Sequence, residues 1–189
     1  DWPGCYGFVV FPTTEAEILI AEQRYPQFPY EIDKVIPEVV HRYFAVALGI
    51  IAILLVAFSY KHKLPTRIKA IASFLLFFIC CQGLFGYLTV SLKLLPIIVT
   101  GHLFGGFITL SLFFYLFLNA SDGIKNYQIG HLKTLGGIAL FALLIQIFLG
   151  AWTSTNYASL ACVDFPTCQG TYMPEMNFSD GFNLSQEVG

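Results

Sequence analysis

Hydrophobic residues occur in four long runs along this chain, and each run is long enough to cross a lipid bilayer as a helix. A bilayer core about 30 Å thick requires about 20 apolar residues per helix, and a helix satisfies its own backbone hydrogen bonds there. The pattern therefore predicts an all-α fold, a polytopic membrane helix bundle. Its membrane region covers residues 38–154, with spans at about 39–60, 70–92, 94–118 and 134–154.

The composition supports a membrane environment. Hydrophobic residues make up 56% of the chain and charged residues only 12%, and the mean hydropathy is +0.68. Soluble domains carry about 25% charged residues, so this chain has too little polar surface for water. The net charge of −2 provides no basic surface, and we expect no nucleic-acid partner.

Positively charged residues predict the orientation of the spans. Loop 61–69 carries four Lys or Arg residues and segment 119–133 carries two, whereas the connection 92–96 carries one. The positive-inside rule places the first two segments on the inner side of the membrane. Residues 1–37 and 155–189 are then outer loops.

Two heptapeptides near opposite ends of the chain match each other. Residues 1–7 read DWPGCYG and residues 164–170 read DFPTCQG, with Asp, Pro, Cys and Gly in the same places. An internal repeat is typical of a duplicated architecture. We therefore expect the chain to be about half of a two-fold protein, with segment 155–189 beginning the second repeat.

Cysteines outside the spans lie on the predicted outer, oxidising side, where disulfides form. Cys162 and Cys168 are six residues apart. A disulfide between them is one interpretation, and two free thiols or soft-metal ligands are the other. If the repeat holds, the partner of Cys5 lies six positions upstream, before Asp1.

Two histidines lie within predicted spans. His41 is about one turn inside the outer end of the first span, and His102 is about two turns inside the outer end of the third. These spans run in the same direction, so the two imidazoles are expected at similar depth. The other histidines, His62 and His131, lie beside inner lysines and are expected to be solvated.

An ionisable side chain within a membrane is costly to bury and marks a candidate functional site. Two histidines on facing helices can hold a haem between them. Nearby glycines would leave room for the flat ring, namely Gly101, Gly105 and Gly106. The alternative is that each histidine only hydrogen-bonds a neighbouring helix.

Glu38 precedes His41 by three residues, which places both on one helix face. The carboxyl could transfer protons beside a bound haem. Alternatively, it stabilises the helix N-terminus after Pro37 opens the helix. Arg42 is expected to extend to lipid head groups, or else to pair with a haem propionate. A di-iron site would need more carboxylates than the spans contain.

In order along nearly the whole chain, the motifs resemble those of the haem A synthase family. They read DWPGCYG, PEVVHRYFA, LLPIIVTGHLFGG and QIFLGAWTSTNYASLACVDFPTCQG. The resemblance implies oxidation of a ring methyl of haem O to a formyl group, giving haem A for terminal cytochrome oxidases. It also implies eight helices in two four-helix bundles, of which this chain holds the second to the fifth.

The resemblance also implies residue roles. His41 and His102 match the pair that ligates the iron of the substrate haem O, and Glu38 matches the acid needed for the oxidation. Cys162 and Cys168 match an outer-loop disulfide. The enzyme would be an oxidoreductase of monooxygenase or hydroxylase type, with a haem b cofactor whose ligands lie in the half outside this chain. The chain alone is not expected to be active.

By the same resemblance, the protein is expected in the bacterial inner membrane, with loops 1–37 and 155–189 in the periplasm. Candidate partners are the lipid bilayer, haem O synthase, cytochrome oxidase assembly factors and a second copy in a homo-oligomer. Two other functions fit the spans. One is a bis-His haem b membrane cytochrome that only transfers electrons, and the other is a structural or transport subunit without haem.

Overall fold

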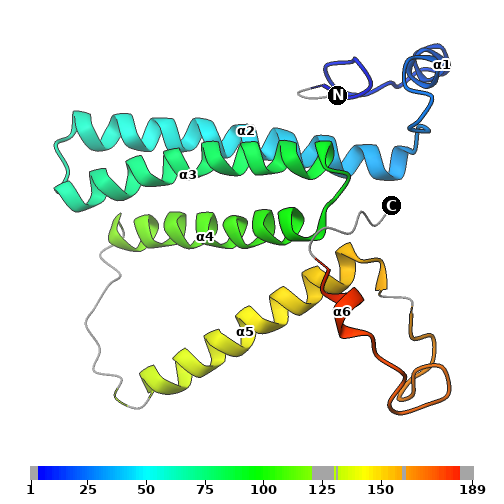
Figure 1. The fold of residues 1–189 in the computed structure, drawn as a ribbon. Coiled ribbons are helices and arrows are strands. Elements are labelled where there is room, and N and C mark those ends of the chain that lie inside the picture. The colour runs from blue at the N-terminus through cyan, green and yellow to red at the C-terminus, as the bar shows by residue number, and fades with distance from the viewer. Residues whose placement is uncertain (1–3, 121–129, 131, 159–160, 184–189) are drawn as a thin grey trace. The chain divides into compact units, whose positions relative to one another are not determined.

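The computed structural model describes residues 4–120, 130, 132–158 and 161–183, and over these residues the fold is all-α (Figure 1). Four of the helices are long and apolar enough to cross a membrane. The predicted all-α chain with four potential membrane-spanning helices is thus confirmed. The helices are α1 (Glu15–Arg24), α2 (Ile32–Lys61), α3 (Thr66–Ser91), α4 (Pro96–Ala120), α5 (Leu132–Thr155) and α6 (Phe178–Gly181).

The chain forms two compact units, Asp1–Leu76 and Phe77–Gly189. The first contains α1, α2 and the first part of α3. The second contains the rest of α3 together with α4, α5 and α6. His41 therefore belongs to the first unit and His102 to the second, and the predicted pairing of their imidazoles on one haem stays a prediction.

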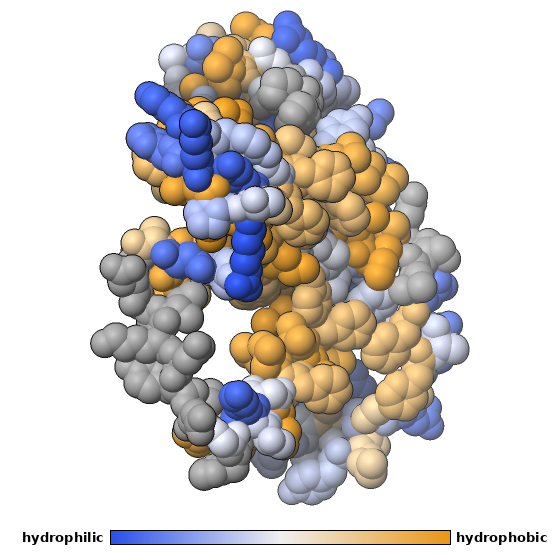
Figure 2. All heavy atoms as spheres, turned by 90° about the vertical axis from the view of Figure 1, so that its left-hand side faces the viewer, coloured by the Kyte–Doolittle hydropathy of each residue, from blue (hydrophilic) through white to orange (hydrophobic). Residues whose placement is uncertain are grey.

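The long helices carry large apolar side chains on their surfaces. Leu54 on α2 is 61% exposed, Leu110 on α4 is 64% exposed and Phe141 on α5 is 66% exposed. Figure 2 shows hydrophobic side chains over much of the face that it displays. Transfer of such surface out of water is favourable by about 25 cal/mol per Å². These side chains are therefore suited to contact with lipid or with further helices.

Helix α2 begins earlier than the hydrophobic run predicts. It starts at Ile32, so Pro37 lies inside the helix instead of opening it. Proline has no N–H to donate within a helix, and the packing of neighbouring side chains compensates for this missing hydrogen bond. Val35 and Val39 lie one turn apart, are each 5% exposed and pack in one cluster with Cys5. This buried face extends the helix at its N-terminus beyond the apolar run.

In the second unit, α3 and α4 approach closely at glycines. A Cβ atom placed on Gly105 would lie 1.4 Å from Nε2 of Gln82, and one placed on Gly101 would lie 3.3 Å from Cε1 of Phe85. Glycine permits this kind of close helix packing in membranes. In this structure side chains of α3 occupy the space at Gly101 and Gly105 where the sequence predicted room for a haem ring, whereas a Cβ atom on Gly106 would meet nothing within 4 Å.

The C-terminal end of α5 is covered by the short helix α6. Trp152 on α5 is 5% exposed, and its indole N–H donates to the carbonyl of Gly181 over 2.7 Å. The indole also stacks on Phe148 and on Phe182. A buried tryptophan with its N–H satisfied fixes this part of the segment after α5 against the span.

Candidate functional site

An arginine connects the first heptapeptide to the predicted site on α2. Arg42 donates from Nη1 to the carbonyl oxygen of Gly4 over 2.6 Å, and its Nη2 pairs with the carboxylate of Glu38. Its side chain is only 19% exposed. Arg42 therefore does not extend to lipid head groups as expected from the sequence. It instead holds the segment before α1 and the Glu38 carboxylate together.

Glu38 and His41 lie in the N-terminal third of α2, and both residues are exposed. The Glu38 side chain is 45% exposed although it is paired with Arg42. The ion pair has the i, i+4 spacing that favours contact along a helix. The arrangement thus offers an oriented carboxylate one turn from an exposed imidazole.

His102 lies in a different environment on α4. It is half-buried, its Nδ1 atom is buried, and its ring lies beside Gly86 of α3. A Cβ atom on Gly86 would lie 3.4 Å from Cε1 and 3.7 Å from Nε2 of the imidazole. Two further polar atoms of α3 and α4, Oγ1 of Thr100 and Oε1 of Gln82, are buried and have no hydrogen-bond partner among the described residues.

Over the same described residues, no group of three or more His, Cys, Asp or Glu side chains could hold a metal ion. A haem iron needs only two axial ligands from the protein, so His41 and His102 remain the candidate pair.

The two heptapeptides form the same tight turn. Cys5 and Phe8 exchange two backbone hydrogen bonds, and so do Cys168 and Thr171. The central residues have positive φ in both turns, namely 52° and 81° at Tyr6 and Gly7, and 53° and 76° at Gln169 and Gly170. Two positive φ angles are the signature of a type I′ turn, which favours glycine. The shared Cys and Gly therefore mark a common turn.

The aspartate of the second heptapeptide ties this turn together, beside a disulfide. Cys162 and Cys168 are joined, with their Cα atoms 4.7 Å apart. Asp164 accepts hydrogen bonds from the hydroxyl of Thr167 and from the backbone N–H groups of Gln169 and Gly170, the latter two over 2.8 and 2.9 Å. The hydrogen bond from Thr167, followed by that from Gly170, lowers the pKa of Asp164.

Acid is expected to loosen the turn that Asp164 holds. Because its pKa is lowered in the folded protein, the carboxylate stabilises the turn fully above the unfolded value of about 3.9. That contribution is lost as the pH falls through the folded pKa. Hydrogen-exchange protection of the Gln169 and Gly170 amides should therefore decrease in acid. Asp164→Asn should decrease it already at neutral pH, and equal protection in variant and wild type would contradict this role.

Cys5, in the first heptapeptide, packs against α2 near Glu38 and Arg42. It is 7% exposed in the cluster with Val35 and Val39. Burial, and then the negative charge of Glu38, raise the pKa of the Cys5 thiol, while Arg42 opposes them. A thiol with a raised pKa stays protonated and is a weak nucleophile, so in this structure Cys5 acts as a packing residue.

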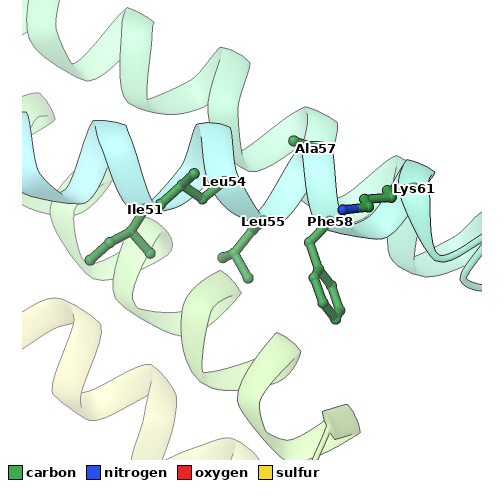
Figure 3. Close-up of a pocket in the computed structure, with 6 residues that line it drawn as sticks. All are labelled: Ile51, Leu54, Leu55, Ala57, Phe58 and Lys61. Carbon is green, nitrogen blue, oxygen red and sulfur yellow. The ribbon is translucent and has the colours of Figure 1, made fainter.

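An open hollow of about 450 Å³ lies along the C-terminal half of α2 (Figure 3). It begins at Ile51, ten residues beyond His41, which corresponds to about 15 Å along a helix. The hollow is therefore separate from the candidate site. Its lining is apolar except at one end, and consists of Ile51, Leu54, Leu55, Ala57, Phe58 and Lys61.

These features define a class: a helical membrane protein with several potential spans. One span carries an acid–arginine pair and a histidine in its N-terminal part, and another carries a second histidine. The chain belongs to the COX15-CtaA family, whose description is cytochrome oxidase assembly protein and whose family model matches residues 1–188.

Individual relatives agree with the family. The chain is 37% identical over 189 residues to a protein named heme A synthase from Shewanella oneidensis, covering 98% of this chain and 57% of that protein. It is 29% identical to the heme A synthases of Shouchella clausii and Halalkalibacterium halodurans, covering 93% and 99% of this chain and 55% and 59% of those proteins. The chain thus spans somewhat more than half the length of these relatives. No solved structure matches it.

Proposed function

We propose that the protein containing this chain is a haem A synthase, an oxidoreductase that converts a ring methyl of haem O to a formyl group. The observation that carries the proposal is the match of 98% of the chain to a protein of that name. The structure supports it by orienting a carboxylate one helical turn from an exposed histidine, through the pairing of Glu38 with Arg42.

The reaction balances with dioxygen, which we assign as the terminal oxidant, as R–CH₃ + O₂ → R–CHO + H₂O. Four electrons leave the carbon, and the hydrogens that leave it must be accepted as protons. We assign this role to the Glu38 carboxylate, which Arg42 orients. A positioned base of this kind contributes about 10²–10⁴-fold to a rate.

His41 and His102 are assigned as the axial ligands of the substrate haem O. Neutral imidazole is a common axial ligand of haem iron, and the half-buried ring of His102 can offer one without the cost of a buried charge. Ligation by both histidines fills the axial positions of the iron. Either one histidine then leaves the iron during the reaction, or electrons leave through the macrocycle while water supplies the oxygen atom.

We further place the protein in the bacterial inner membrane, with residues 1–37 and 155–189 on the periplasmic side. The connection 92–96 carries one Lys, whereas loop 61–69 carries four Lys or Arg residues. This difference in positive charge supports the orientation. A haem b cofactor would take its ligands from the part of the protein outside this chain.

The bound haem of the purified full-length protein tests the function against its alternatives. The protein is produced in a host that makes haem O, and the extracted haem is identified by mass spectrometry. Haem O or haem A is expected. Haem b alone would instead indicate an electron-transfer cytochrome, and a preparation without haem would indicate a structural or transport subunit.

A further inference from the structure

The ring of His102 lies against α3 at Gly86, where the helix has no side chain. Its Cε1 and Nε2 atoms lie 3.4 and 3.7 Å from the place that a Cβ atom of Gly86 would occupy. The Cε1–Nε2 edge of the imidazole is thus the edge that faces α3. Nε2 is one of the two nitrogens through which histidine ligates metals, so the neighbour of this edge affects where the ring can point.

The contact at Gly86 is one of three close contacts between a side chain and a glycine that join α3 and α4. Gln82 fills the space above Gly105, Phe85 lies against Gly101, and His102 lies against Gly86. Residues 82–86 of α3 thus meet residues 101–105 of α4 at three points. Because interlocked helices resist sliding, Gly86 is held opposite His102 by its neighbours.

We propose that Gly86 is a positioning residue for His102: the absence of a side chain at residue 86 gives the imidazole the space it needs to adopt the orientation in which it ligates the substrate iron. This inference rests on the proposed function, in which His102 is an axial ligand. A branched side chain at residue 86 would occupy the place of the ring, and a well-packed interior cannot absorb such added volume without displacement.

Gly83 provides a matched control on the same helix. It lies three residues before Gly86, and a Cβ atom placed on it would meet nothing within 4 Å. Substitution of either glycine changes helix propensity by the same amount. A difference between the two variants therefore reports the contact with His102.

The test compares full-length Gly86→Val and Gly83→Val. In the haem-loaded protein, optical and EPR spectra should show loss of the low-spin haem O signal for Gly86→Val only, and added imidazole should restore it by supplying the missing ligand. In the haem-free protein, modification of His102 by diethylpyrocarbonate, read by mass spectrometry, should be faster in Gly86→Val than in Gly83→Val.

An unchanged low-spin signal together with unchanged His102 modification in Gly86→Val would overturn the proposal. If that variant does not fold, Gly86→Thr replaces it, because a Cβ on residue 86 is already at van der Waals distance, 3.4 Å, from the ring, and the branched atoms of Thr extend beyond that Cβ. His102 modification should then differ between Gly86→Thr and Gly83→Thr, and equal rates would overturn the proposal. If the wild-type protein binds no haem O, the proposed function is wrong. The rates of His102 modification in the haem-free variants still test the contact between His102 and Gly86.

Discussion

Substitution of Glu38 by Gln in the full-length protein is expected to leave haem O bound and to slow its conversion to haem A by about 10²–10⁴-fold, the usual contribution of a positioned base. The amide of Gln has nearly the same shape as the carboxylate but cannot accept a proton from the reacting methyl. Spectra of bound haem O should therefore change little while haem A formation nearly stops. The measurement is the ratio of haem A to haem O extracted from the purified protein.

Glu31→Gln is the matched control for this substitution. Glu31 lies at the N-cap of the same helix, and its carboxylate pairs with the exposed Lys34. Exposed pairs of this kind contribute little to stability, so haem A formation should stay at the wild-type level. Normal haem A formation by Glu38→Gln would exclude the proton-accepting role and would favour a site that only transfers electrons.

The second large effect is expected from the histidines. His41→Ala and His102→Ala should each abolish the low-spin spectrum of bound haem O. Retained haem O should fall by more than about tenfold, since loss of even an outer-shell partner of a metal ligand costs about 10–100-fold in affinity. Haem content per protein and the EPR signal are the measurements.

His62→Ala is the control for the histidine variants. His62 lies at the other end of α2, where its ring is 4.2 Å from that of Phe58. It is exposed and distant from the proposed site along the helix, so its loss should leave haem content and spectrum unchanged. If His41→Ala or His102→Ala kept both properties as well, the assignment of axial ligands would be wrong.

The sequence predicted the spans and the candidate residues because the bilayer imposes strict requirements. A span must be long and apolar, so hydropathy located the helices that became α2, α3, α4 and α5. An ionisable side chain in such a span is conspicuous because its burial is costly. His41, Glu38 and His102 could therefore be identified before any contact was known.

The contacts of these residues could not be predicted in the same way, because they depend on close approach between distant parts of the chain. Arg42 binds the carbonyl of Gly4, which is 38 residues away. Gly101 and Gly105 accept side chains of α3, whereas their position beside His102 in the sequence suggested space for a haem ring. Helix α2 extends to Ile32 because Val35 packs against Cys5, a contact that helix-capping patterns do not reveal.

The turn in the two heptapeptides could have been predicted from the sequence. Both heptapeptides have a Gly two residues after a Cys, and this repeat served above only as a sign of duplication. Glycine at the second central position is what a type I′ turn requires. The same spacing thus contained a structural signal, which the positive φ angles at Gly7 and Gly170 make explicit.

Haem A formation in membranes of a host that makes haem O but no haem A tests the proposed function most directly. The full-length wild-type protein and Glu38→Gln are compared at equal protein content, and the extracted haems are identified by mass spectrometry. Haem A is expected with the wild type, and haem O without haem A is expected with Glu38→Gln. Equal haem A in both, or a wild-type protein that binds haem b and forms no haem A, would contradict the proposed chemistry of this site.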